Sequence, residues 1–125
     1  MFFECKKLAE VNIPESIRVI GVCAFSYCES ISHIIIPHGV EKIADYAFSF
    51  CKLSYAVLPT SIVSLGYGCL MNGYDSSTVY YMGTKDEWNA IEKNQIVWVC
   101  FYSPTKPQES GIYWYYDADG NVVTW

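Results

Sequence analysis

The residues whose spacing could bind a metal ion lie near the C-terminus, where Asp117, Asp119 and Asn121 alternate with small residues. Oxygen ligands two residues apart are typical of calcium-binding loops. The EF-hand pattern would, however, need an acidic residue at the position of Tyr115, and no acidic residue follows the loop. Aspartate, asparagine and glycine also favour tight turns. We therefore interpret this stretch as a solvent-exposed turn and predict no metal site.

A second kind of chemistry would need a cysteine thiol beside a histidine, and Cys28 lies close in sequence to His33 and His38. The strand pattern described below places His33 on an outward face and Cys28 inside, so the two should not meet. His38 follows Pro37 in an expected turn, and no third group orients either histidine. The sequence also lacks the G-x-S-x-G, P-loop and H-E-x-x-H motifs. We predict no catalytic residues, no cofactor and no enzymatic activity.

The six cysteines could suggest disulfides or a zinc site, but their spacing argues against both. Cys5, Cys28 and Cys51 are 23 residues apart and hold the same position in a repeat. Their side chains should stack in parallel, which is the wrong geometry for a disulfide. No C-x-x-C pair occurs, and the other three are dispersed: Cys23, Cys69 and Cys100. Buried cysteine acting as a small hydrophobic residue is the preferred interpretation.

Aromatic residues are the third candidate for function, because twelve of the 21 lie in residues 74–125. Four are consecutive, so they cannot all face one core: Tyr113, Trp114, Tyr115 and Tyr116. Such rings could form a platform that stacks on a sugar or a peptide. Alternatively they pack on the preceding coil as a cap, and this second interpretation is favoured.

The elements that position these residues repeat every 23 residues. Pro14 and Pro37 are 23 apart, as are Phe25 and Phe48, whereas Pro59 follows Pro37 by 22. A fixed period of this length is typical of a solenoid, in which each coil buries its apolar face against its neighbours. Like residues should then stack in columns, which we expect for Phe2, Phe25 and Phe48 and for Ile20, Ile43 and Leu65.

Each repeat contains a short alternating segment before its proline, which predicts a strand with one buried face. The outward residues of these strands would line an open sheet face, the usual binding surface of a solenoid. Whether they form a ligand site or are merely strand-forming residues on a tolerated face is left open. The residues of this candidate ligand face are Glu10, Asn12, His33, Ile35, Tyr55 and Val57. After each proline we expect an irregular return arm, with a close backbone approach at Gly21 and Gly66.

The second half of the chain predicts a different set of elements. Thr84 and Glu87 form a capping box, which predicts a helix over residues 85–93 with Trp88 and Ile91 on its buried face. We expect residues 78–81 and 96–102 to continue the parallel sheet, with this helix as the crossover. A hairpin over residues 112–125 would cap the open end of the solenoid.

Composition excludes several classes of protein. A hydrophobic content of 52% excludes a disordered chain. The net charge of −5 argues against nucleic acid and anionic membranes as partners. No apolar run approaches the length of a membrane helix, so no membrane insertion is predicted. No signal peptide is visible, so the sequence itself leaves the location open.

The repeat pattern C-x-x-L-x-x-[VI]-x-[IL]-P-x-x-[IV]-x-x-[IL]-G-x-x-A-F resembles the BspA-type leucine-rich repeat over residues 1 to about 70. In the third unit the Ala-Phe pair is replaced by Cys69-Leu70, which suggests that the array is ending. The second half is similar to a C-terminal module found after such repeats. The resemblance implies a curved parallel sheet and a bacterial surface or secreted protein, several relatives of which act in adhesion.

We therefore expect a β-rich α+β fold: a short leucine-rich-repeat solenoid of 23-residue coils in residues 1–73, and a capping module in residues 74–125. The predicted function is non-catalytic binding of a protein ligand on the outward sheet face. The alternatives are binding of a glycan or cell wall by the C-terminal aromatics and a purely structural end of a longer array. Because the repeat begins in mid-coil, we also expect self-association through residues 1–25 or a preceding array.

Overall fold

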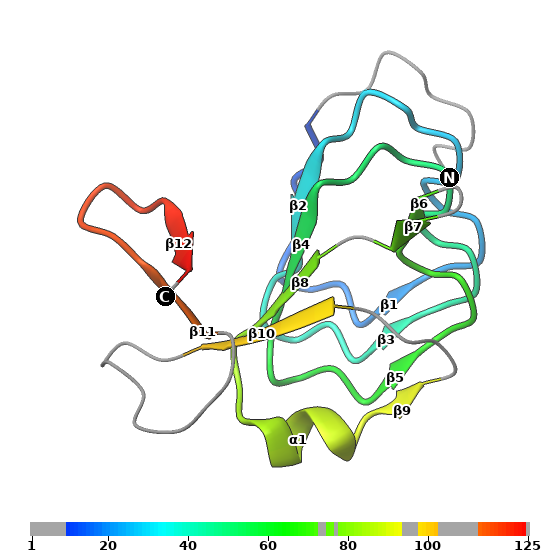
Figure 1. The fold of residues 1–125 in the computed structure, drawn as a ribbon. Helices are drawn as coiled ribbons and strands as arrows, with labels where there is room; N and C mark the ends of the chain where they lie inside the picture. The colour runs from blue at the N-terminus through cyan, green and yellow to red at the C-terminus, as the bar shows by residue number, and fades with distance from the viewer. Residues whose placement is uncertain (1–9, 73–74, 77, 94–97, 103–112, 125) are drawn as a thin grey trace.

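The computed structural model describes residues 10–72, 75–76, 78–93, 98–102 and 113–124 of the 125-residue chain. The chain winds in successive coils, and strands belonging to two parallel sheets alternate along it (Figure 1). The smaller sheet has the order β1-β3-β5-β9. Its strands are β1 (Val19–Ile20), β3 (Lys42–Ile43), β5 (Ser64–Leu65) and β9 (Glu92–Lys93).

The larger sheet has six strands in the order β12-β11-β10-β8-β4-β2. All neighbours are parallel except the last pair along the chain, β11 and β12, which is antiparallel. The strands are β2 (His33–Ile35), β4 (Tyr55–Leu58), β8 (Thr78–Tyr81), β10 (Trp98–Tyr102), β11 (Tyr113–Tyr116) and β12 (Val122–Thr124). A small antiparallel pair is formed by β6 (Met71–Asn72) and β7 (Asp75–Ser76).

The core lies between the two sheets and is built from the predicted columns. Ile20, Ile43 and Leu65 are aligned in register on β1, β3 and β5, and all three are buried. The rings of Phe25 and Phe48 stack with their centroids 5.0 Å apart and their planes 5° from parallel. Phe2, the first member of the predicted column, lies outside the described residues. The solenoid prediction is thus confirmed in its central feature, the stacking of like residues.

The smaller sheet was not predicted, because the return arm after each proline was expected to be irregular. Its strands are only two residues long, which is too short for an alternating pattern to be visible. Each strand nevertheless aligns with the same position of the next coil, as in the pairing of Ile20 with Ile43. The 23-residue period therefore indicates this pairing between coils, whereas the local alternation of apolar residues does not.

The turns that follow β1, β3 and β5 join the coils by a third row of hydrogen bonds. The backbone N–H groups of Phe25 and Phe48 donate to the oxygens of Ala47 and Cys69, at 2.7 and 2.8 Å. Four non-glycine residues in these turns have positive φ, between 54° and 60°: Cys23, Tyr27, Tyr46 and Phe50. Gly66 lies where an added Cβ would be 2.6 Å or less from backbone atoms of Ala44 and Asp45. This agrees with the close backbone approach predicted at Gly66. The same prediction for Gly21 is wrong, because no described residue lies within 4 Å of a Cβ added there.

The predicted first strand is absent, which corrects the expectation for Glu10 to Ile13. Residues 10–13 have no strand assignment, and β2 is the edge strand of the larger sheet within the described part of the chain. A hollow of about 430 Å³ separates residues 10–13 from β2. No ladder hydrogen bond joins these two described segments, so residues 10–13 do not form a strand of the sheet.

Helix α1 (Lys85–Asn89) begins as predicted but ends earlier. Thr84 accepts a hydrogen bond from the Glu87 N–H, and the Glu87 carboxylate accepts one from the Thr84 N–H, so the capping box is confirmed. The prediction of a helix to residue 93 is wrong, because Glu92 donates its backbone N–H to the oxygen of Val63 and begins β9. Pairing with β5 thus overrides the helical pattern. Trp88 and Ile91 are buried as expected.

The C-terminal strands confirm two predictions and correct a third. β8 and β10 continue the parallel sheet, with α1 in the connection between them. β11 and β12 form the predicted hairpin, although residues 112 and 125 lie outside the described part. The hairpin covers the edge of β10 but does not simply close the end of the coils, because it projects on the outward side of the larger sheet (Figure 1).

Both sheets extend through residues on either side of the predicted boundary at residue 73, so the division into two parts stays a prediction. Self-association through residues 1–25 also stays a prediction, and residues 1–9 lie outside the described part. Among the described residues, no helix has the length and apolar character needed to cross a lipid bilayer.

Candidate functional site

The predicted ligand face divides into an exposed part and a covered part. His33 and Ile35 on β2 are exposed, as are Glu10 and Asn12 in the segment beside it. Tyr55 on β4 is half-buried, and Val57 is fully buried. The prediction that Val57 belongs to an open face is therefore wrong. The exposed part of the predicted ligand face therefore consists of residues on β2 and in the segment beside it.

Val57 is buried because the C-terminal hairpin folds over this part of the sheet. Val57, Cys100 and Trp114 form a second apolar cluster on the outward side, separate from the core between the sheets. Half-buried side chains surround it: Tyr55, Tyr80, Tyr102, Tyr116 and Val122. Alternation along β4 correctly placed Val57 on the outward side, but it could not reveal that another segment would cover it.

Trp114 anchors the hairpin and is not part of an exposed aromatic platform. Its side chain is fully buried, and its Nε1 donates a hydrogen bond of 3.1 Å to the backbone oxygen of Tyr81. Tyr113, Tyr115 and Tyr116 are half-buried. In the favoured interpretation these rings pack on the preceding coil as a cap. Trp114 is buried as that interpretation requires, but it packs against the outward side of the larger sheet. The prediction of a four-residue platform is wrong at this residue.

A continuous series of aromatic contacts crosses the outward side of the larger sheet. The ring of His33 stacks on Tyr55 at 5.2 Å, and Tyr55 meets Tyr80 edge-on at 5.5 Å. Tyr80 in turn contacts Trp114 at 5.6 Å, and Trp114 contacts Tyr116 at 5.0 Å. The sequence analysis treated the predicted ligand face and the C-terminal aromatic residues as separate candidates. These ring contacts connect members of both sets on the same side of the sheet.

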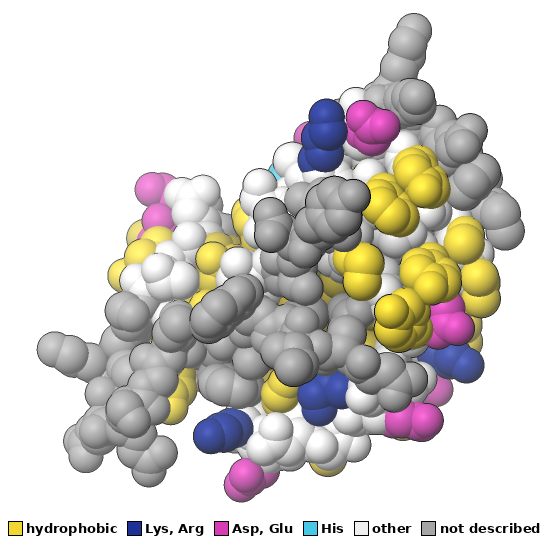
Figure 2. All heavy atoms as spheres, turned by 45° about the vertical axis from the view of Figure 1, so that its right-hand side comes forward, with side chains coloured by type: hydrophobic (Ala, Val, Ile, Leu, Met, Phe, Trp, Pro, Cys, Tyr) yellow, Lys and Arg dark blue, Asp and Glu magenta, His cyan; other side chains and the backbone are white. Residues whose placement is uncertain are grey.

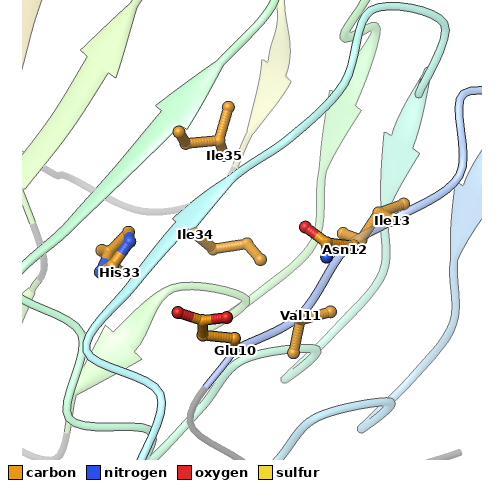
Figure 3. A pocket seen from close by; sticks show the side chains of 7 residues that line it. All are labelled: Glu10, Val11, Asn12, Ile13, His33, Ile34 and Ile35. Carbon is orange, nitrogen blue, oxygen red and sulfur yellow. The ribbon is translucent and has the colours of Figure 1, made fainter. Parts of the chain in front are cut away.

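Two hollows open on this surface, and Ile35 borders both. The first, of about 430 Å³, lies between residues 10–13 and β2. Figure 3 shows residues 10–13 running beside β2, with His33 and Ile35 on one side of the strand and Ile34 on the other. The second hollow, of about 260 Å³, lies between the sheet and the hairpin and is lined by Ile35, Tyr55, Tyr80, Tyr116, Gly120, Asn121 and Val122.

Two of the tyrosines that line the second hollow, Tyr80 and Tyr116, have a raised phenol pKa. Burial raises the pKa of Tyr80, and the nearby Cys100 and Tyr55 add to this. Burial likewise raises the pKa of Tyr116, with smaller contributions from Tyr55 and Tyr102. A phenol of ordinary pKa is already protonated at neutral pH, and a raised pKa leaves it so; both hydroxyl groups can therefore donate hydrogen bonds.

The acidic loop is a self-contained turn. One carboxylate oxygen of Asp117 accepts hydrogen bonds from the N–H groups of Asp119 and Asn121, at 2.9 and 2.8 Å. These bonds, led by that from Asn121, lower the pKa of Asp117. Within the described residues there is no group of three or more side chains suited to hold a metal ion. The arrangement is that of a hydrogen-bonded turn.

The cysteine and histidine considered for catalysis lie on opposite sides of the coil wall. Cys28 is fully buried in the core, whereas His33 is exposed, with its Nδ1 3.3 Å from the Ser32 hydroxyl. Cys51 is also buried and donates its thiol proton to the backbone oxygen of Phe25 at 2.8 Å. No disulfide joins any two of the cysteines in the described residues.

One surface was missed by the sequence reasoning, the row of aromatic side chains on the turns. Hydrophobic side chains gather on the right-hand part of the face that Figure 2 brings forward. Tyr27 stacks on Phe50 at 4.7 Å, and Tyr46 meets Tyr67 edge-on at 5.6 Å, with all four partly exposed. The 23-residue spacing of Tyr27 and Phe50 was the signal that could have revealed the first pair.

Comparison with known proteins gives one family match and one structural match. The model of the BspA type leucine rich repeat region matches residues 1–102. A leucine rich cell surface protein from Faecalibacterium prausnitzii A2-165 has a similar solved structure, with a TM-score of 0.68 and 26% sequence identity. The similarity covers 76% of this chain but only 25% of that protein. No curated protein matches.

Proposed function

The chain belongs to the BspA-type leucine-rich repeat family, and we propose that it is a non-catalytic module that binds a protein ligand at a cell surface. Repeat proteins of this architecture generally act as interaction surfaces. The surface location is supported by the solved relative, which is a cell surface protein. Because this chain spans a quarter of that relative's length, the proposal concerns the module and not a whole protein.

The observation that supports a binding role is the exposure of Ile35. Its side chain is 52% exposed on β2, although Ile34 and Ile36 beside it are buried. It stands between the two hollows of the outward surface. An exposed aliphatic residue flanked by concavities is suited to act as an anchor that is buried when a ligand binds.

Neighbouring residues supply the polar rim that such an anchor needs. His33 lies beside Ile35 on the same face, and Glu10 and Asn12 lie across the first hollow (Figure 3). Interfaces commonly surround an apolar centre with polar groups that remain partly hydrated. A protein segment seated over β2 would bury Ile35 and contact this rim on one side.

The proposal is tested by probing an array of purified extracellular and cell-surface proteins with the full chain, followed by surface plasmon resonance of each protein that binds. We expect Ile35→Glu to weaken binding by about tenfold or more, equivalent to about 1.4 kcal/mol. Val63→Glu is the matched control, because Val63 is 62% exposed and immediately precedes β5 of the other sheet. Equal affinities of the two variants would contradict the assigned surface.

A further inference from the structure

The hollow between the hairpin and the larger sheet has the geometry of a small binding cleft. Ile35, Tyr55 and Tyr80 form its floor on β2, β4 and β8. Its wall comes from the hairpin, through Tyr116, Asn121 and Val122. The cleft is held open by a fixed support, because the buried Trp114 packs beneath the hairpin and is bonded to the Tyr81 oxygen. A preformed cleft of this kind loses little entropy when a ligand binds.

Three tyrosines and an asparagine supply the polar groups among the described residues that line this cleft. Tyr55, Tyr80 and Tyr116 line the cleft, and each side chain carries a phenolic hydroxyl. No hydrogen bond joins any of these three hydroxyls to another of the described residues. The side-chain amide nitrogen of Asn121 donates to Asp117 at 3.3 Å, which leaves its carbonyl oxygen as an acceptor. Partly buried polar groups of this kind favour a ligand that can satisfy them.

Among the described residues, none that lines the cleft is charged, which limits the chemistry of the ligand that this part of the chain favours. Two acidic residues, Asp117 and Asp119, adjoin lining residues in sequence, but neither lines the cleft. The Asp117 carboxylate is occupied by the backbone N–H groups of its own loop. A phosphate, sulfate or carboxylate group would find no cation here, and a basic peptide would find no lining anion. The ligand should therefore be neutral.

We propose that this cleft binds a single pyranose ring of a neutral glycan. The apolar C–H face of a sugar ring stacks on aromatic side chains, while its hydroxyl groups exchange hydrogen bonds with the tyrosine hydroxyls and the Asn121 amide. The hollow, of about 260 Å³, is smaller than the sites of drug-sized ligands, which usually span about 300–1,000 Å³, so it suits a ligand portion no larger than a single ring.

A proline-rich peptide is the competing occupant, because proline rings also dock on aromatic grooves. Such a peptide presents one carbonyl acceptor per residue, whereas a pyranose carries several hydroxyl groups on one ring. Three hydroxyls and an amide within so small a volume match the sugar better. The inference goes beyond the proposed protein ligand and does not depend on it, because Tyr116 and Asn121 lie outside the hollow between residues 10–13 and β2.

The test is a microarray of neutral and acidic glycans probed with the full chain, followed by isothermal titration calorimetry with each free oligosaccharide that binds. We expect neutral glycans to bind. Tyr116→Ala and Asn121→Ala should each weaken binding by about tenfold, and Tyr80→Phe, which removes only the hydroxyl, by several-fold. Tyr67→Ala is the control, since Tyr67 is a half-exposed aromatic residue outside the cleft. The Tyr67→Ala variant should bind the glycan with the same affinity as the unmodified chain.

The proposal is overturned if no neutral glycan binds at millimolar concentration, if only acidic glycans or a proline-rich peptide bind, or if Asn121→Ala and Tyr80→Phe bind glycan like the unmodified chain. These two variants change few atoms and retain the fold even where Tyr116→Ala does not, so the result is decisive in either case. Asn121→Ala should leave binding of a protein ligand over Ile35 unchanged, which separates this test from that of the proposed function.

Discussion

The indole Nε1 of Trp114 donates a hydrogen bond to the backbone oxygen of Tyr81, 33 residues earlier in the chain. This bond ties the hairpin to the strand that the last complete coil contributes to the sheet. We expect Trp114→Ala to lower the free energy of unfolding by about 3–5 kcal/mol, because it removes a large buried side chain. Trp114→Phe should cost less, about 1–3 kcal/mol, mainly for the unsatisfied Tyr81 oxygen. Urea unfolding measures both, and an unaffected Trp114→Ala would contradict the anchoring role.

The stacked pair Phe25 and Phe48 predicts a second large effect. Phe48 is fully buried, and its truncation to alanine leaves a cavity between two coils. We expect Phe48→Ala to lower the free energy of unfolding by about 3–5 kcal/mol. Phe50→Ala is the control, since Phe50 is partly exposed in the same turn and should cost about 1 kcal/mol or less. Equal midpoints in thermal unfolding would argue against the column.

Gly66 and Gly21 occupy the same position of the repeat but have different surroundings. An added Cβ at Gly66 would lie 2.4 Å from the backbone nitrogen of Asp45, whereas at Gly21 nothing among the described residues lies within 4 Å. We expect Gly66→Ala to destabilise the fold by about 1–3 kcal/mol through overpacking, and Gly21→Ala to be nearly neutral. Chemical denaturation of the two variants compares them directly.

The left-handed backbone conformation at Tyr46 predicts that glycine is more stable than alanine at this position. Its φ is 57°, and the residue at the equivalent position of the next coil is Gly68, with φ 60°. Glycine adopts this conformation without the steric cost that other residues incur, which is about 1–2 kcal/mol. Tyr46→Gly should therefore be more stable than Tyr46→Ala by about 1 kcal/mol. Urea unfolding of the two variants tests this, and a higher free energy of unfolding for Tyr46→Ala than for Tyr46→Gly would contradict backbone strain at this position.

Alkaline pH should destabilise the protein through its buried thiols. Burial raises the pKa of Cys51 and of Cys69 from 9.0 to about 12. Between these values the folded state keeps protons that the unfolded state has released, so the stability present below about pH 9 is lost as pH rises towards 12. The urea midpoint, measured under reducing conditions from pH 8 to 11, should fall. The double variant Cys51→Ala/Cys69→Ala should show a shallower fall than the unmodified chain.

The sequence predicted correctly those parts of the fold that depend on the repeat period or on contacts between residues close in sequence. The 23-residue period predicted the columns of Ile20 and Phe25, because stacked coils bring like residues together. The capping box at Thr84 and Glu87 predicted the start of α1, because both hydrogen bonds form within four residues. The end of α1 was not predictable in this way, since it is set by pairing of Glu92 with β5.

The sequence identified individual candidate residues, but it did not predict how they are arranged relative to one another. Alternation correctly assigned Ile35 and Val57 to the outward side of the sheet, yet one is exposed and the other buried. Their difference arises from Trp114, more than 50 residues later, which packs against Val57. No local pattern encodes such a contact, so the cleft between hairpin and sheet became visible only in the structure.

The three rows of hydrogen bonds that join the coils have a mechanical consequence. Neighbouring coils are connected in the smaller sheet, in the larger sheet and along the turns, as between Tyr27 and Ser49. A pulling force along the direction of stacking would act on all three rows together and not on one strand at a time. Rupture of this stack would then proceed in steps of a whole coil, which gives the module a resistance to tension that its small size alone would not suggest.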